Sequence, residues 1–132
     1  MKKSLLILVA CFTLFSFSPV QAETVTNNDV QLRNDLIFIT LVPLIFKEIE
    51  KQYGKPKQFN CGNILEIKKL EQSGYSFDVT VQVTTFEGAH NPPNDLVTIT
   101  FSNYRSPSSD WQAVDFKSRR LKPNEELCKH SL

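Results

Sequence analysis

A histidine lies within nine positions of two carboxylates in the segment from Glu87 to Asp95, which also carries two consecutive prolines. The imidazole of His90 can act as a general base if a carboxylate orients its ring, and the three side chains are also of types that bind metals. No recognised motif accompanies them, so a rigid loop that binds a ligand, or that serves only the fold, explains the same residues. The candidate binding residues are Glu87, His90, Asn91, Pro92, Pro93 and Asp95.

The sequence lacks the short motifs of common enzymes and cofactor sites. It has no glycine-rich phosphate loop, no His-Glu-x-x-His, no Gly-x-Ser-x-Gly and no Cys-x-x-Cys. We therefore assign no catalytic residues, no metal ligands and no cofactor. We favour a non-enzymatic module that binds a protein or another ligand at the cell envelope or outside the cell. A small hydrolase or metal-dependent enzyme that uses His90 is the alternative.

The first 22 residues have the features of an export signal. Lys2 and Lys3 form a positive end, residues 5–17 are nearly all apolar, and Ala22 completes a small-residue cleavage pattern. We expect cleavage after Ala22 and a secreted or envelope-associated protein. An uncleaved membrane span would need roughly 18 to 20 apolar residues, more than this run provides. A lipoprotein is a further alternative, because Cys11 follows a Leu-x-small pattern.

Two of the three cysteines remain after such a cleavage, Cys61 and Cys128. Outside the cell a disulfide between them is the natural interpretation, and it would close a loop of about 67 residues. In the chain-entropy model that loop is worth roughly 4 kcal/mol. Two unpaired thiols are the alternative. A metal site is disfavoured because no histidine lies at ligand spacing from either cysteine.

Cleavage would leave 110 of the 132 residues, which suits one domain over residues 23–132 with a short C-terminal tail. Without Lys2 and Lys3 the chain has 13 basic and 14 acidic residues, a net charge of −1. Such a balance disfavours a nucleic-acid role. A basic cluster near the end is followed closely by Glu125, and we interpret it as a solvated surface. The cluster consists of Lys117, Arg119, Arg120 and Lys122.

The segment from Tyr75 to Phe86 alternates most regularly between apolar and polar residues, which predicts a strand. One of its faces should belong to the core and the other should meet water. The core face comprises Tyr75, Phe77, Val79, Val81 and Val83. The polar face includes Thr80, Gln82 and Thr84, and the next strand adds Thr98 and Thr100.

A helix is predicted from about Asp29 to Tyr53, capped by Asn28 or Asp29 and ended by Gly54. Pro43 lies inside it, so we expect either a kink there or two helices. One apolar stripe consists of Leu32, Leu36, Ile39, Pro43, Phe46, Ile49 and Tyr53. A second apolar stripe, formed by Ile37, Leu41, Leu44 and Ile45, indicates that the middle of the helix is buried on more than one side.

Three further strands are predicted, over residues 64–70, 97–102 and 111–119, the last with Val114 and Phe116 facing inward. A helix followed by an antiparallel meander indicates an α+β fold, with the helix on one face of a four-stranded sheet. Its outline would be cystatin-like. That comparison concerns shape alone and implies no inhibitor activity.

Several segments resemble a family of small exported proteins from Bacillus-type, Gram-positive bacteria that is defined as a domain of unknown function. They are Leu41-Val42-Pro43-Leu44-Ile45, Tyr53-Gly54-Lys55-Pro56, the strand from Phe77 to Phe86 and His90-Asn91-Pro92-Pro93. The resemblance covers about Asp35 to Phe116. It implies an extracytoplasmic location and one small domain, with no activity or catalytic residue to carry over. Asn94 departs from the pattern, in which an aromatic residue often follows the two prolines, and this puts binding by the loop in doubt.

Overall fold

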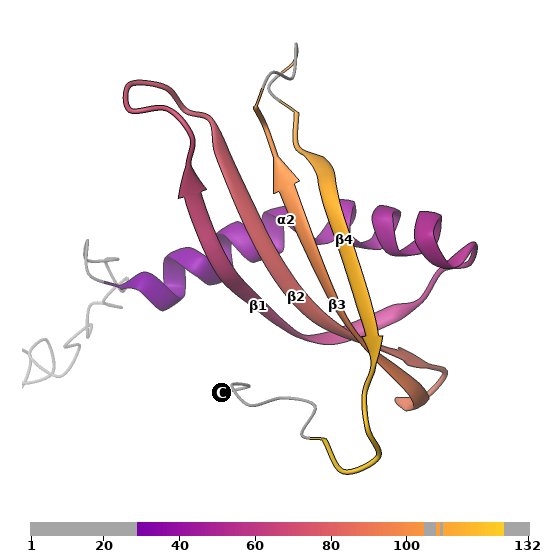
Figure 1. The fold of residues 1–132 in the computed structure, drawn as a ribbon. Coiled ribbons are helices and arrows are strands. Elements are labelled where there is room, and N and C mark those ends of the chain that lie inside the picture. Colours follow the sequence, from indigo (N-terminus) through magenta and orange to yellow (C-terminus); the bar gives the residue numbers. More distant parts are fainter. Residues whose placement is uncertain (1–28, 105–107, 109, 126–132) are drawn as a thin grey trace, which may run out of the picture.

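A computed structural model describes residues 29–104, 108 and 110–125 (Figure 1). The expected export signal, the lipoprotein alternative at Cys11, the end of the C-terminal tail and Cys128 lie outside the described residues. The predicted disulfide therefore stays a prediction. No helix in the described part of the chain is long and apolar enough to cross a membrane.

The helix α2 spans Val30–Tyr53, as the sequence predicts. Asp29 caps its first turn by accepting a hydrogen bond from the backbone N–H of Leu32 at 3.0 Å. Gly54 ends it in the left-handed conformation, with φ of 69°, and its N–H donates to the carbonyl of Glu50. The helix runs continuously through Pro43, so the alternative of two helices is not seen. A kink at Pro43 stays a prediction.

Four strands follow the helix in the order of the sequence: β1 (Gln58–Lys69), β2 (Phe77–Glu87), β3 (Asn91–Ser102) and β4 (Gln112–Arg120). Each pairs antiparallel with the next to form one sheet, and α2 lies across one face of it (Figure 1). The predicted α+β fold, one helix on a four-stranded antiparallel meander, is confirmed. Its cystatin-like outline stays a prediction.

The core lies between α2 and the two central strands. The register places Val81 opposite Ile99 and Val83 opposite Val97, so alternate side chains of β2 and β3 form one apolar surface. Side chains of α2 cover this surface, and each fully buried one contributes about 1.5–3 kcal/mol to stability. The core residues are Leu41, Ile45, Ile49, Val79, Val81, Val83, Val97, Ile99 and Phe101.

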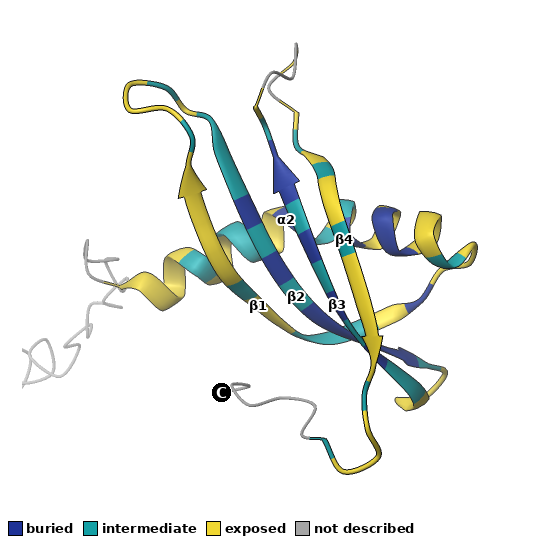
Figure 2. Cartoon of the chain, in the orientation of Figure 1, coloured by how far each residue is buried: buried dark blue, intermediate teal, exposed yellow. Residues whose placement is uncertain are grey.

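The first predicted apolar stripe of the helix is largely not the one that faces the sheet. Leu36 is 64% exposed and Ile39 is 61% exposed, and Leu32 and Phe46 are exposed too. The second stripe packs on the strands instead, through Leu41 and Ile45. In Figure 2 the N-terminal half of α2 consequently shows no buried residues.

Several predicted details of the strands are wrong, and irregular pairing explains most of them. Tyr75 precedes β2 and is 87% exposed. Val114 is 61% exposed because the pairing of β3 and β4 shifts there, whereas Phe116 packs against the core as expected. β1 begins at Gln58, earlier than expected, because the pairing with β2 shifts between Asn60 and Asn63 and breaks the alternation.

The helix comes closest to the sheet at this irregular part of β1. A β-carbon on Gly62 would lie 2.0 Å from the Phe38 ring, so glycine alone leaves room for the ring. The neighbouring Cys61 has a left-handed backbone with φ of 55°. The bulge therefore lets Phe38 of α2 sit directly against the backbone of β1.

The predicted polar face of the sheet forms cross-strand contacts, but the prediction that Thr84 meets water is wrong, because Thr84 is buried, at 1% exposed. The hydroxyls of Thr80 and Thr100 lie 3.0 Å apart, and Gln82 donates to the hydroxyl of Thr98 at 3.3 Å. Threonine suits exposed strands and pairs across them, so these contacts serve the sheet itself.

Candidate functional site

The segment from Glu87 to Asp95 is not the long loop that the sequence suggests. Strand β2 continues to Glu87 and β3 starts at Asn91, which leaves a turn of residues 88–90. Gly88 and His90 have positive φ angles of 51° and 61°, as a tight turn requires. The prolines are accommodated because the pairing shifts between Thr85 and Glu87, where no regular hydrogen-bond ladder needs their missing N–H groups.

His90 lies at the end of this hairpin with its ring stacked on Phe86. The ring centroids are 4.1 Å apart and the planes are inclined by 15°. His90 is exposed and Phe86 is buried. The imidazole thus covers an aromatic ring.

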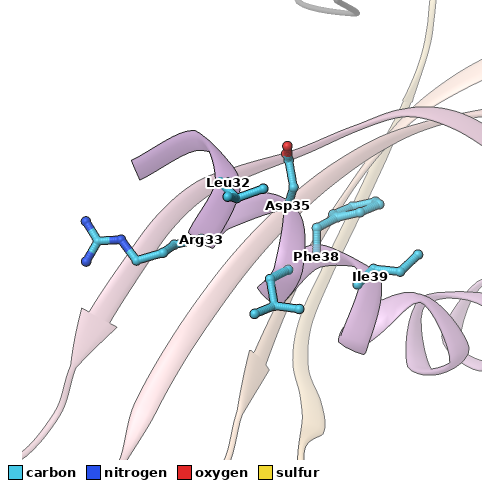
Figure 3. A pocket seen from close by; sticks show the side chains of 6 residues that line it. Leu32, Arg33, Asp35, Phe38 and Ile39 are labelled. Carbon is cyan, nitrogen blue, oxygen red and sulfur yellow. The ribbon is translucent and has the colours of Figure 1, made fainter. Parts of the chain in front are cut away.

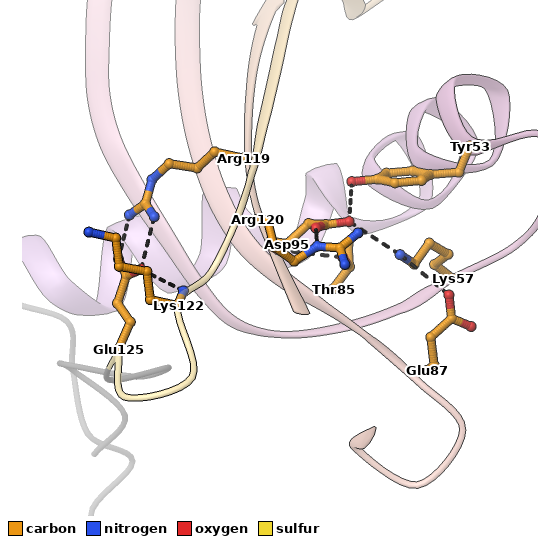
Figure 4. Close-up of polar contacts among 9 residues, drawn as sticks. All are labelled: Tyr53, Lys57, Thr85, Glu87, Asp95, Arg119, Arg120, Lys122 and Glu125. Atoms are coloured by element: carbon orange, nitrogen blue, oxygen red, sulfur yellow. Dashed lines mark hydrogen bonds and ion pairs between the residues drawn. The ribbon is translucent and has the colours of Figure 1, made fainter. Parts of the chain in front are cut away.

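Asp95 is buried on the side of the sheet that faces α2, and its partners come from α2, β2, β4 and the link before β1 (Figure 4). Arg120 of β4 donates to one carboxylate oxygen at 2.5 Å. The other oxygen accepts from the hydroxyl of Tyr53 at 3.0 Å and lies 3.5 Å from the ammonium of Lys57. Thr85 of β2 donates to the Asp95 carbonyl at 3.4 Å. The Asp95 carboxylate therefore ties the end of α2 and the link before β1 to β3 and β4.

Lys57 joins Asp95 to the second predicted carboxylate, Glu87. The Lys57 side chain is only 3% exposed, and its ammonium lies 3.5 Å from Glu87 and 4.3 Å from the centre of the Tyr53 ring. Glu87 also pairs with Lys55 at 3.1 Å. Both carboxylates are thus occupied by lysine or arginine side chains.

The electrostatics of this cluster keep Asp95 charged. Burial by itself raises the pKa of Asp95, but the hydrogen bonds from Arg120 and Tyr53 and the nearby positive charges outweigh it and hold the pKa below its usual value. Burial, together with the charge of Asp95, raises the pKa of Tyr53. The hydrogen bond and charge of Lys55, helped by Lys57, lower the pKa of Glu87.

The structure does not assemble the predicted catalytic or metal group. His90 contacts Phe86, whereas Glu87 and Asp95 face lysines and Arg120. The described residues contain no group of three or more His, Cys, Asp or Glu side chains placed to hold a metal ion.

A cavity of about 740 Å³ lies beside the Asp95 cluster, between the start of β3 and the chain that follows β4. The backbone N–H of Leu121 donates to the Asn94 carbonyl at 2.9 Å and fixes the two segments together. The side-chain oxygen of Asn94 is buried and has no hydrogen-bond donor among the residues that the structure describes. The lining residues are Pro92, Pro93, Asn94, Arg120, Leu121, Lys122, Pro123 and Glu125.

Glu125 holds the far wall of this cavity. Both of its carboxylate oxygens accept from the Arg119 guanidinium, at 2.5 and 3.0 Å, and one also accepts from the Lys122 N–H (Figure 4). These bonds lower the pKa of Glu125 to about 2. Arg119 and Arg120 are engaged in ion pairs, whereas the ammonium of Lys122 lies within 4.0 Å of no carboxylate in the described part of the chain, although its charge helps to lower the pKa of Glu125.

Four of the predicted binding residues, Glu87, Asp95, Pro92 and Pro93, lie in or beside this region, and His90 and Asn91 lie further along the hairpin. Sequence reasoning missed Tyr53, Lys57 and Leu121 as members of it. An antiparallel meander places the end of β4 beside the start of β3, so the basic cluster at Arg119 and Arg120 was the available signal.

The fold and the cavity together define a small α+β domain with a proline-walled cavity at the end of its sheet. The chain belongs to the family described as "Protein of unknown function (DUF3888)", which matches residues 33–118 and so includes most of α2 and most of the sheet. This confirms the resemblance to a domain of unknown function. Neither the curated proteins nor the solved structures contain a significant match.

Proposed function

We propose that the protein is a non-enzymatic binding module whose ligand enters the cavity between Pro92–Asn94 and residues 120–125. The buried oxygen of Asn94 carries this proposal, because Asn94 lines the cavity and this hydrogen-bond acceptor has no donor among the described residues. An unpaired buried acceptor costs about 1–3 kcal/mol, and a ligand with an N–H or O–H group would remove that cost.

The other walls of the cavity indicate the chemistry of the ligand. Pro92, Pro93 and Pro123 offer apolar surface, and Lys122 offers a positive charge. A ligand with an apolar body, a hydrogen-bond donor and a negative group would satisfy all three, as an acidic peptide segment does. Glu87 and Asp95 serve as internal supports, since they fix Lys57 and Arg120.

A capture experiment tests this function. The protein is immobilised and exposed to an envelope extract of its host, and the retained components are identified and quantified by mass spectrometry. Asn94→Leu should reduce capture by about tenfold or more, since a lost hydrogen bond to a buried group is worth 1–3 kcal/mol. The same substitution removes the unpaired acceptor and should leave the free energy of unfolding unchanged or higher.

The combined variant His90→Ala, Pro92→Ala and Pro93→Ala separates the cavity wall from the hairpin tip. We expect it to lose capture, and His90→Ala alone to retain it, because His90 lies outside the cavity lining. Thr98→Ala on the polar face of the sheet is the matched control and should bind normally. Undiminished capture by Asn94→Leu would refute the cavity as the binding site.

We also propose that the domain acts outside the cytoplasm, after cleavage following Ala22. The support is the sequence of residues 1–22, with its positive end, apolar run and small-residue cleavage pattern. The intact mass of the protein recovered from its host tests this directly. A mass that begins at Glu23 supports export, a mass that begins at a lipidated Cys11 indicates a lipoprotein, and an unprocessed chain contradicts both.

A further inference from the structure

The N-terminal half of α2 exposes an apolar stripe that the fold leaves without a partner among the described residues. Leu32, Leu36 and Ile39 recur at helical spacing and are all exposed. They line an open pocket of about 650 Å³ with Arg33, Asp35 and Phe38 (Figure 3). A continuous apolar surface of this kind on a small protein marks an interaction site.

This half of the helix reaches beyond the sheet. Phe38 is the residue that packs on Gly62 of β1, and the helix continues from there to Val30, outside the edge of the sheet (Figure 1). At about 1.5 Å per residue, the eight residues before Phe38 project about 12 Å. Strands lie about 4.8 Å apart, so the projection spans the width of about two more strands.

The strand beside this projection, β1, is an edge strand of the sheet, and no strand of the described residues pairs with its outer edge. The N–H of Leu70 donates to the carbonyl of Ser76, so Leu70 directs its backbone N–H and C=O toward β2. Along an antiparallel pair of strands, residues that are hydrogen-bonded to the neighbouring strand alternate with residues that are not. The backbone N–H and C=O groups of Glu66 and Lys68 therefore point to β2, and those of Ile67 and Lys69 point away from the sheet. Ile67 thus presents an N–H and a carbonyl to a further strand.

We propose that β1 pairs antiparallel with β1 of a second copy of this chain, with the twofold axis at Ile67. In this register Ile67 bonds to the partner's Ile67 through the two outward backbone groups. Glu66 then lies opposite Lys68 of the partner, and Lys68 opposite the partner's Glu66. Both form unbonded pairs, in which side chains approach most closely. The sequence around Ile67 is complementary in charge to itself.

The same axis explains the exposed stripe on the helix. A twofold axis perpendicular to the joined sheet keeps both helices on one side of it. Phe38 packs on Gly62, five residues from Ile67, so each projecting half-helix lies roughly 16 Å from the axis along the strand, on the side where the chain that follows the partner's β1 lies. Leu32, Leu36 and Ile39 can pack against the other copy there. The opposite edge of the sheet lacks this combination, because the helix end near β4 exposes Glu50, Lys51 and Gln52.

Charge-reversed variants test this dimer. Sedimentation velocity over a range of concentrations should show a dimer for the unaltered protein. Glu66→Lys sets lysine against lysine twice across the axis, and Lys68→Glu sets glutamate against glutamate. We expect each variant alone to associate about tenfold more weakly or worse.

Mixing the two variants restores opposite charges at both positions. We expect a mixed dimer, recognised by native mass spectrometry when one variant carries ¹⁵N. The double variant Glu66→Lys with Lys68→Glu should also dimerise. Asp115→Lys on the other edge strand is the matched control and should leave the dimer unchanged. Few other interfaces would give this reciprocal pattern.

Ile67→Pro provides an independent test, because it removes an outward N–H and leaves the bonds between β1 and β2 in place. It should yield a monomer with an unchanged circular dichroism spectrum. A protein that is monomeric at all concentrations would overturn the proposal. So would a dimer that tolerates both Glu66→Lys and Ile67→Pro, since its interface would then lie elsewhere.

Discussion

The carboxylate of Asp95 holds together the C-terminal end of α2, the start of β3 and the end of β4. It is buried, yet it accepts from Arg120 and Tyr53 and lies beside Lys57, so its charge is balanced by groups from the helix end and from β4. A buried charge whose partner is removed is far more costly than the intact pair is stabilising. Its role at this scale is to fix Arg120 and Lys57 in place.

We expect Asp95→Asn to lower the free energy of unfolding at pH 7 by about 3 kcal/mol, because it leaves the buried Lys57 with only the partly exposed Glu87 as a carboxylate partner. Urea denaturation measures the loss. Asp115→Asn removes an exposed pair with Lys117 and is the control, with an expected loss below about 1 kcal/mol. A loss for Asp95→Asn as small as that of the control would contradict this role.

The difference in the free energy of unfolding between the unaltered protein and Asp95→Asn should depend on pH. The pKa of Asp95 is lowered in the folded state, so its contribution is complete above the unfolded pKa of about 3.9 and disappears as the pH falls through the folded value. The gap between the unaltered protein and Asp95→Asn should therefore be constant from pH 7 to about pH 5 and shrink in more acidic solution.

The sequence predicted some of the residues in this region but not the contacts between them. It selected Glu87, Asp95 and the prolines because unusual residues cluster there. It could not assign partners, because Tyr53 is 42 residues from Asp95 and Arg120 is 25 residues away. Such contacts depend on the register of β3 with β4 and on where the helix ends, and local patterns fix neither.

At the scale of elements, the sequence predicted which segments form helix and strands better than it predicted which faces they bury. Both stripes of α2 are apolar, so periodicity alone could not decide between Leu36 and Leu41. The bulge of β1 determines which stripe faces the sheet. It leaves room for the Phe38 ring at Gly62, and this contact fixes the rotation of the helix on the sheet. Bulges leave no simple sequence pattern, which is also why Val114 was placed on the wrong face.

The contact between Phe38 and Gly62 can be tested by adding one methyl group. Gly62→Ala would place a β-carbon inside the van der Waals radius of the ring and should lower the free energy of unfolding by about 1–3 kcal/mol. In a Phe38→Ala background the ring is gone, so the same substitution should cost little. Equal losses in both backgrounds, measured by urea denaturation, would show that the backbone of β1 and not the ring is responsible.

At the scale of the whole molecule, the predicted bond between Cys61 and Cys128 would fasten the C-terminal tail to the bulge of β1. Closing a loop of that length should add roughly 4 kcal/mol to the free energy of unfolding. Protein recovered from its host should therefore unfold at a lower urea concentration after reduction. Cys61→Ala with Cys128→Ala should match the reduced protein and be insensitive to reductant. If reduction changes neither mass nor stability, the thiols are unpaired.

The strand order β1-β2-β3-β4 has a consequence for how the chain acquires its structure. Each strand pairs with the strand that precedes it in the sequence. The helix and the first three strands can therefore assemble before β4 joins the sheet. Until then Asp95 has Lys57 and Tyr53 but lacks Arg120, which arrives near the end of the last strand. We expect the docking of β4 to be the late step that commits the chain to its native state, because only then does Arg120 complete the hydrogen bonds of the buried Asp95 carboxylate.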